Sequence, residues 1–268
     1  MDFSEIFSQT WKEYKSNFST ILKFMLVFIT IPSLIFLLIN TSLILSNENL
    51  KMLVLINSQE SPLSLSKGYN FYLTMILITS LISMVLALFA YAGLTSTSLK
   101  KTKFKFSDLV YSSKKNFWRY LAYCIVVIIF LFLLFILLIV PMIIFSIYWI
   151  FASYVLFDQN KGILESLKTS RKIVRGRWWK VLGYSILFVL IIITISIGIS
   201  LVSSIILLPY LVADGLSPLL SQGPITPTFF VLRQITSFIS QIISNITVIP
   251  LTILFYKNFY LKLKNSKR

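Results

Sequence analysis

Five residues between two apolar stretches carry the most concentrated binding chemistry in this sequence. Lys172, Arg175 and Arg177 supply positive charge, and Trp178 and Trp179 follow with two indole rings. Cationic side chains pair with phosphate groups, and tryptophan rings favour the headgroup depth of a bilayer. The group therefore predicts contact with anionic lipid headgroups or with a soluble partner. The alternative interpretation is that these cations only fix the orientation of the chain in a membrane.

A polar stripe inside a long apolar stretch is the second group that could do chemistry. Its members recur every three or four residues, which places them on one face of a helix. They are Gln234, Ser237, Gln241, Ser244 and Asn245. In a membrane such side chains hydrogen-bond to neighbouring helices, or they line a polar cavity through which a substrate passes. The spacing alone is compatible with both interpretations.

The residue types on which most catalysis and metal binding depend are scarce. The chain has no histidine, and its one cysteine, Cys124, lies inside an apolar stretch and cannot form an intrachain disulfide. No phosphate loop, dinucleotide fingerprint or cysteine cluster occurs. No Asp or Glu falls near the centre of an apolar stretch, where an ionisable residue would indicate function. We therefore predict a protein that is not an enzyme and uses neither a metal nor a cofactor.

The composition indicates a membrane protein. Hydrophobic residues make up 57% of the chain and charged residues 13%, against about 45–50% and about 25% in soluble proteins. A net charge of +16 would suggest nucleic acid in a soluble protein, but here the cations flank apolar stretches. Lys and Arg gather in this way on the cytoplasmic side of membrane proteins. We therefore expect no nucleic acid, and we expect membrane lipids, including anionic headgroups, as partners.

The apolar stretches set the number of membrane crossings. A helix needs about 20 residues to cross a hydrocarbon core of about 30 Å. A stretch of 38 uncharged residues, 120–157, would be about 57 Å long as one helix. It should form two helices with the break at Pro141, because proline disfavours helical geometry in the residue before it. Four further stretches are each long enough for one crossing: residues 21–45, 71–99, 181–208 and 229–256.

The distribution of charge supports six crossings. With six, 22 of the 25 cations fall on one side, and only Lys51, Lys67 and Arg233 fall on the other. With five, the split would be 11 against 14, which is no bias. Cytoplasmic loops carry the excess of Lys and Arg. We therefore expect a multi-pass protein of the cytoplasmic (plasma) membrane with both termini in the cytoplasm.

A short basic amphipathic stretch precedes each pair of predicted helices. These stretches are residues 3–18, 106–118 and 163–179, and they are expected in the membrane–water interface. Gly176 should let the chain turn from the third stretch into the next span. The predicted fold is an all-α integral membrane protein of six transmembrane helices in three hairpins, each preceded by a basic amphipathic interfacial helix. The hairpins cover about residues 1–99, 100–157 and 158–268 of a single membrane domain.

The segment 162–183, GILESLKTSRKIVRGRWWKVLG, resembles the central motif of a prokaryotic membrane-domain family. That family includes the membrane domain of glycerophosphodiester phosphodiesterases and stand-alone relatives of unknown function. The segment 10–18, TWKEYKSNF, looks like the opening helix of the same family. The matching positions of the central motif are Ser170, Arg175, Gly176 and Trp179.

The resemblance extends to the end of the chain, with two departures. Pro250, Phe255 and Tyr256 match the family, whereas Lys257 replaces an acid and Arg171 replaces a frequent tryptophan. The resemblance implies a six-helix, all-α membrane domain of largely unknown role. In the fused enzymes the phosphodiesterase chemistry belongs to a separate soluble domain, so the resemblance does not imply that activity for this chain.

Two functions are compatible with these features. The first is a non-enzymatic membrane protein that anchors, scaffolds or helps to organise envelope partners. Its basic cytoplasmic face would contact anionic lipid or a protein partner. The alternative is a transporter or permease-like subunit that moves a small or lipidic solute. A charge at the bilayer midplane or a pair of discontinuous helices would favour the transporter.

Overall fold

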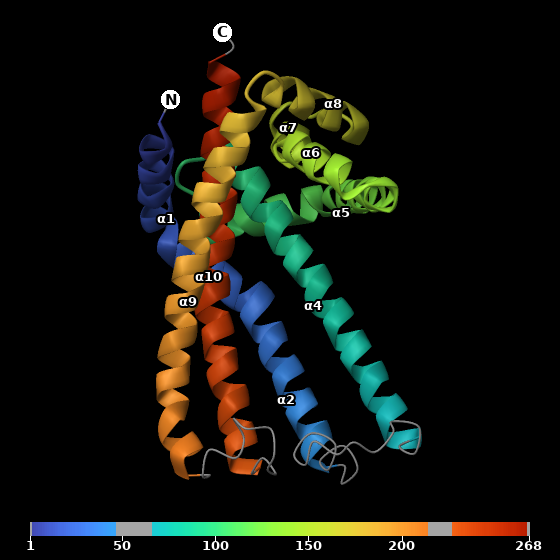
Figure 1. Cartoon of the computed structure of the whole chain (residues 1–268), viewed down its shortest axis with the longest axis vertical. Coiled ribbons are helices and arrows are strands. Elements are labelled where there is room, and N and C mark those ends of the chain that lie inside the picture. The colour runs from blue at the N-terminus through green and yellow to red at the C-terminus, as the bar shows by residue number, and fades with distance from the viewer. Residues whose placement is uncertain (1, 47–65, 214–226, 267–268) are drawn as a thin grey trace. The chain divides into compact units, whose positions relative to one another are not determined.

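The computed structural model of the chain describes residues 2–46, 66–213 and 227–266. In these residues the regular structure is helical, and they contain no strand (Figure 1). Most of the two predicted external loops, residues 46–70 and 209–228, lies outside them. The elements are α1 (Phe3–Met25), the π-helix η1 (Leu26–Thr30), α2 (Ile31–Ser46), α4 (Ser66–Lys100), α5 (Phe106–Leu137), α6 (Ile139–Trp149), α7 (Ala152–Asp158), α8 (Ile163–Val174), α9 (Trp178–Ala213) and α10 (Pro227–Asn265).

Six helical segments among the described residues are long and apolar enough to cross a membrane. An all-helical chain with this many apolar segments is a multi-pass membrane protein, because a soluble fold could not cover so much apolar surface. The segments are Phe3–Ser46, Asn70–Lys100, Phe106–Leu137, Ile139–Asp158, Trp178–Pro209 and Phe230–Asn265.

The apolar stretch 120–157 divides as expected, but not at the expected residue. Helix α5 ends at Leu137, Leu138 is extended (φ −167°, ψ 142°), and α6 begins at Ile139. The prediction that Pro141 breaks the helix is therefore wrong, because α6 is continuous through this residue. The physical reason is that Pro141 lies in the first turn of α6. The N–H groups of a first turn have no acceptor within the helix, so proline loses no hydrogen bond there.

The three amphipathic stretches are built differently. The first is the beginning of α1, which continues through η1 into α2 without a break, and the second is the beginning of α5. Only the third includes a separate helix, α8, which is linked to α9 by three residues that contain Gly176. Gly176 has a φ of +83°, a geometry that side chains with a Cβ rarely adopt. The prediction that glycine makes this turn is confirmed.

The chain folds into two compact units, which we describe separately. Unit 1 comprises Met1–Met25, Ala87–Ile193 and Ile246–Arg268. Unit 2 comprises Leu26–Leu86 and Thr194–Asn245. Each unit is therefore assembled from segments that are distant in the sequence.

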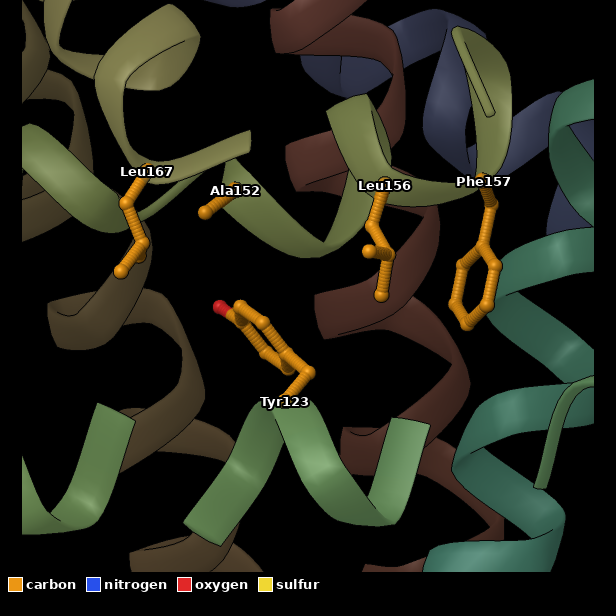
Figure 2. Packing of buried hydrophobic residues seen from close by; sticks show 5 residues of the cluster. All are labelled: Tyr123, Ala152, Leu156, Phe157 and Leu167. Atoms are coloured by element: carbon orange, nitrogen blue, oxygen red, sulfur yellow. The ribbon is translucent and has the colours of Figure 1, made fainter. Parts of the chain in front are cut away.

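Unit 1 has an aromatic core. Tyr123 of α5 points toward Ala152 of α7 and Leu167 of α8, as Figure 2 shows, and Leu156 of α7 belongs to the same cluster. Phe151, directly before α7, is fully buried, and its ring lies 5.3 Å from that of Phe259 in α10. Burial of large aromatic side chains stabilises a fold strongly. These contacts join α5, α7, α8 and the end of α10.

Unit 1 also buries polar side chains, and several of them bind groups on other helices. Lys257 of α10 is 2% exposed and forms an ion pair with Glu13 of α1. Asn258 donates a hydrogen bond of 3.2 Å to the hydroxyl of Thr10. The Tyr154 hydroxyl donates to the carbonyl of Ile253 at 3.0 Å. Partnered groups of this kind fix α1, α7 and α10 in one arrangement, because a buried polar group without a partner is unfavourable.

The connection between α4 and α5 is fixed by two close contacts. The amide of Asn17 donates to the carbonyl of Thr102 at 2.8 Å and accepts from the N–H of Phe104 at 3.1 Å. A Cβ placed on Gly93 of α4 would lie 2.0 Å from Oγ of Ser113 and 2.8 Å from the carbonyl oxygen of Leu109 in α5. Only glycine permits so close an approach of the two helices.

Unit 2 is apolar, and many of its large side chains are exposed. Leu38, Leu77 and Ile205 are 60–68% exposed, as expected of side chains that face lipid. Its hydroxyls bond mainly within their own helices, as when Ser33 donates to Ile29 at 2.7 Å and Thr236 to Leu232 at 2.7 Å. Most hydroxyls of unit 2 are therefore satisfied within their own helices, whereas Thr30, Asn40 and Thr41 each bury a side-chain oxygen without a hydrogen-bond partner among the described residues.

Candidate anion-binding site in unit 1

A hollow of about 390 Å³ in unit 1 brings three cationic side chains together. We call it the basic hollow. It lies where the end of α4, the first half of α5 and the end of α7 with Asn160 meet. Ser96, which is 1% exposed, contributes to its floor. Its lining residues are Ser96, Lys100, Lys115, Asn116, Arg119, Phe157, Asp158 and Asn160.

A second hollow of about 290 Å³ shares Lys100, Lys115 and Asn116 with the first. Its other lining residues on α5 are Asp108, Tyr111 and Ser112. Together with Arg119, these α5 residues recur every three or four positions, so one face of the helix serves both hollows. The contacts at Asn17 and Gly93 position this face, because they fix the connection between α4 and α5.

The acids near the hollows are already engaged. Asp108 pairs with Lys101 at 2.8 Å and accepts a hydrogen bond from the N–H of Lys105 at 3.0 Å. Asp158 accepts from the hydroxyl of Tyr260 at 2.6 Å and from Nζ of Lys264 at 2.5 Å. These carboxylates are used by neighbouring helices and do not neutralise the lysines that the hollows share.

The cations of the basic hollow lack acidic partners. Lys100 and Lys115 are exposed, and among the described residues neither forms an ion pair. Arg119 donates to the side-chain oxygen of Asn160 and to the carbonyl of Lys161, which are both neutral. Asn160 presents its oxygen from a left-handed backbone (φ 51°), a geometry that asparagine tolerates. A concave, positively charged surface of this size fits a phosphate group.

The predicted cluster at residues 172–179 is only partly available for binding. Arg177 donates to the hydroxyl of Ser266 and, at 3.4 Å, to the carbonyl of the same residue. The indole N–H of Trp178 donates to the carbonyl of Ile144 at 3.4 Å. Arg177 and Trp178 thus bind other parts of unit 1.

The other members of this cluster face outward. Lys172 and Arg175 are exposed, and Trp179 is 78% exposed. The Trp179 ring lies edge-on to Trp178, with 4.8 Å between the ring centroids. Of the predicted five residues, Lys172, Arg175 and Trp179 are therefore the exposed ones.

The predicted polar stripe of α10 lies outside the cavity that α9 and α10 enclose in unit 2. A cavity of about 410 Å³ in unit 2 lies between α9 and α10, and its hydroxyls come from Ser203, Thr236 and Ser240. Ser203 and Ser240 hydrogen-bond to each other across the two helices. The stripe residues Gln234, Ser237, Gln241, Ser244 and Asn245 are absent from the lining, and Ser237 and Gln241 are exposed.

Sequence reasoning missed the basic hollow. The spacing of Asp108, Ser112, Lys115 and Arg119 was a usable signal, since it marks one helical face. The second half of the hollow was not predictable, because residues 157–160 approach α5 only through the packing of α7 against α8.

The fold defines an α-helical, multi-pass membrane protein with a basic hollow in unit 1. Residues 117–263, more than half of the chain, match the family described as Domain of unknown function (DUF7847), and the chain belongs to this family. No curated protein and no solved structure matches the chain. The family match does not test the resemblance to the phosphodiesterase membrane domain, which stays a prediction.

Proposed function

We propose that the protein is a non-enzymatic anchor or scaffold of the cytoplasmic membrane that binds anionic lipid headgroups through the basic hollow. The observation that carries this proposal is the meeting of Lys100, Lys115 and Arg119 in one hollow without a free carboxylate. Phosphate groups bind such sites through charge-assisted hydrogen bonds. The exposed side chains of Lys172, Arg175 and Trp179 would extend the contact with the headgroup layer.

The proposed orientation places unit 1 on the cytoplasmic side with both termini. Unit 1 contains 22 of the 25 cations, and the other three belong to unit 2. Lysine and arginine gather on the cytoplasmic side, where the leaflet is rich in anionic lipid. Charge pattern and lipid preference therefore favour the same side. A basic unit in this position could also hold an envelope partner beside the membrane.

Headgroup binding can be tested with the purified protein in detergent. The probe is a fluorescent short-chain phosphatidylglycerol, with phosphatidylcholine as the neutral comparison. Lys100→Gln with Lys115→Gln should weaken phosphatidylglycerol binding about thirtyfold, because each lysine contributes about 1 kcal/mol near anionic lipid. Binding of phosphatidylcholine should not change.

The matched control is Lys103→Gln with Lys114→Gln, which removes the same charge from two exposed lysines outside the basic hollow. It should weaken binding by only a few-fold. If the two double variants bind phosphatidylglycerol equally well, the hollow is not the site. The cations would then serve only to orient the chain.

A transporter or permease-like subunit is the second candidate, and one observation favours it. The cavity between α9 and α10 holds about 410 Å³, and its walls are apolar apart from a few hydroxyls. Such a cavity fits an apolar solute or a lipid chain better than an ion. Filling it with Gly198→Leu should abolish uptake if the cavity conducts a solute, and should leave headgroup binding unchanged.

A further inference from the structure

The turn between α5 and α6 contains no polar side chain. Every residue from 125 to 144 is apolar. At the turn itself Leu137, Leu138 and Val140 are 64–72% exposed. By contrast, the sequences that connect the other two hairpins contain many Ser, Asn, Pro and Gly residues. A turn that emerged into external water would hold a large apolar patch there, which is unfavourable.

Helix α6 is too short to cross a bilayer. Its 11 residues span about 16 Å, roughly half of a hydrocarbon core of about 30 Å. The segment Ile139–Asp158 reaches the length of a crossing only with α7, which is separated from α6 by a turn at residues 150–151 and packs in the core of unit 1. Phe151, Ala152 and Val155 are fully buried.

The second half of α6 already contacts the basic elements of unit 1. Trp178 donates to the carbonyl of Ile144 at 3.4 Å, and the Ser170 hydroxyl donates to the carbonyl of Tyr148 at 2.7 Å. The guanidinium of Arg171 lies 5.5 Å from the ring centroid of Phe145. From Ile144 to the turn at Leu138 the helix advances only about 9 Å. The turn therefore lies close to the depth of Trp178.

The direction of the α5–α6 hairpin is consistent with a hairpin that enters the membrane without crossing it. Within unit 1, α5 and α6 run across the segments of α9 and α10 rather than alongside them (Figure 1). Helices α9 and α10 have 36 and 39 residues, the lengths of helices that cross a bilayer completely. A hairpin that runs across them does not follow their path through the membrane.

We propose that the α5–α6 hairpin enters the bilayer from the cytoplasmic side, turns at Leu138 within the hydrocarbon and returns to the same side. Four segments then cross the membrane instead of six. The partner of the exposed apolar tip is the acyl region of the cytoplasmic leaflet. The charge pattern is unaffected, because a hairpin that returns to its own side leaves the flanking basic loops where they were.

The backbone of the turn suits a site with little water. Only Leu138 leaves helical geometry, and its N–H donates to the carbonyl of Leu134 at 2.9 Å. Pro141, in the first turn of α6, has no N–H that would need a partner. Pro141 and the bond from Leu138 thus lower the number of open backbone donors at the tip, which favours a hydrocarbon environment.

The proposal is tested by single cysteines in a Cys124→Ala background. Leu138→Cys should resist a membrane-impermeant maleimide in intact cells and in inside-out vesicles, and react only after denaturation in detergent. Lys103→Cys and Arg233→Cys are exposed reporters for the two faces. Labelling of Leu138→Cys from outside, at the rate of Arg233→Cys, would overturn the proposal, and so would rapid labelling in inside-out vesicles.

A depth measurement separates lipid from protein around the tip. A fluorophore on Leu138→Cys, in vesicles of phosphatidylcholine and phosphatidylglycerol, should be quenched strongly by lipids brominated along the acyl chain and weakly by a headgroup quencher. Absence of acyl-chain quenching would show that protein covers the tip, and stronger headgroup quenching would place the tip at the surface. Either result refutes the proposal.

The proposal rests on the cytoplasmic position of α8 that forms part of the proposed function. Arg171→Cys, an exposed position on α8, reports on that position separately. If Arg171→Cys is cytoplasmic and Leu138→Cys reacts from outside, only the re-entrant hairpin is refuted. If Arg171→Cys reacts from outside intact cells, the proposed orientation fails with it.

Discussion

The two units of this protein differ most in their net charge. The whole net charge of +16 belongs to unit 1, whereas the three cations and three acids of unit 2 cancel. The units are distinguished by their packing alone, so the division is independent of the charge pattern. The agreement between the two indicates that charged residues gather where protein contacts and water can satisfy them. Unit 2, which carries no net charge, exposes apolar side chains that are compatible with contact with lipid.

The same difference appears in the buried polar groups. In unit 1 several of them bind across helices, as Lys257 binds Glu13 and Tyr154 binds the backbone of α10. In unit 2 most hydroxyls bond within their own helix, and Ser203 and Ser240 also bond to each other across two helices. Polar side chains should therefore hold unit 1 together and contribute little to unit 2.

The largest expected effect comes from the buried ion pair of unit 1. Lys257→Met should lower the free energy of unfolding by about 3–5 kcal/mol, because it leaves the Glu13 charge without its partner in a buried site. Thermal and denaturant unfolding in detergent, followed by circular dichroism, measures the loss. Lys12→Met, on the exposed side of α1, should change stability by less than about 0.5 kcal/mol.

The double variant Glu13→Leu with Lys257→Met distinguishes a pairing effect from a packing effect. It removes both charges and should recover most of the stability lost in Lys257→Met, since buried pairs can often be replaced by apolar residues. A single variant as stable as the Lys12→Met control would contradict the view that buried polar contacts hold unit 1 together.

An intermediate effect is expected from two glycines, one in each unit. Gly93→Ala should destabilise unit 1 by about 1–3 kcal/mol, because the new Cβ would overlap Ser113 and the backbone of α5. Gly198→Ala in α9 meets nothing within 4 Å and should stabilise its helix by about 0.5–1 kcal/mol. Effects of the same sign at both positions would remove the contrast in packing between the units.

The smallest expected effect concerns the hydroxyl pair that joins α9 and α10 in unit 2. Ser240→Ala removes this hydrogen bond and should lower stability by about 0.6 kcal/mol, the usual value for such bonds between membrane helices. Unfolding of the purified protein in bicelles can resolve this difference. A loss larger than that of Gly93→Ala would mean that polar contacts matter more in unit 2 than in unit 1.

Much of the helical pattern could be predicted from the sequence, because length and periodicity are local properties. The separate helix α8 and the turn at Gly176 followed from spacing and from the backbone freedom of glycine. The break at Leu138 could not be predicted from the sequence. Proline breaks a helix when it lies in the interior but is tolerated in the first turn, where Pro141 lies. The residues around Pro141 are all apolar, so they did not indicate whether Pro141 lies in the interior of a helix or in its first turn.

The candidate site was less predictable than the fold. The sequence identified Arg175 and Trp179 because they are close in the chain to other cations and rings. It did not identify the site formed by Lys100 and Arg119. These two residues lie close together only because α4 and α5 approach each other at Gly93 and α7 ends at Asp158. Sites built from distant segments require the packing, which composition and spacing do not contain.

The central claim is that unit 1 is the cytoplasmic, charged part of a membrane protein. Its most direct test is labelling of Arg171→Cys and Arg233→Cys, each in a Cys124→Ala background, with an impermeant maleimide on intact cells. We predict that Arg233→Cys reacts at once and that Arg171→Cys reacts only in inside-out vesicles. Reaction of Arg171→Cys on intact cells would contradict the claim and place the basic hollow on the wrong side of the membrane.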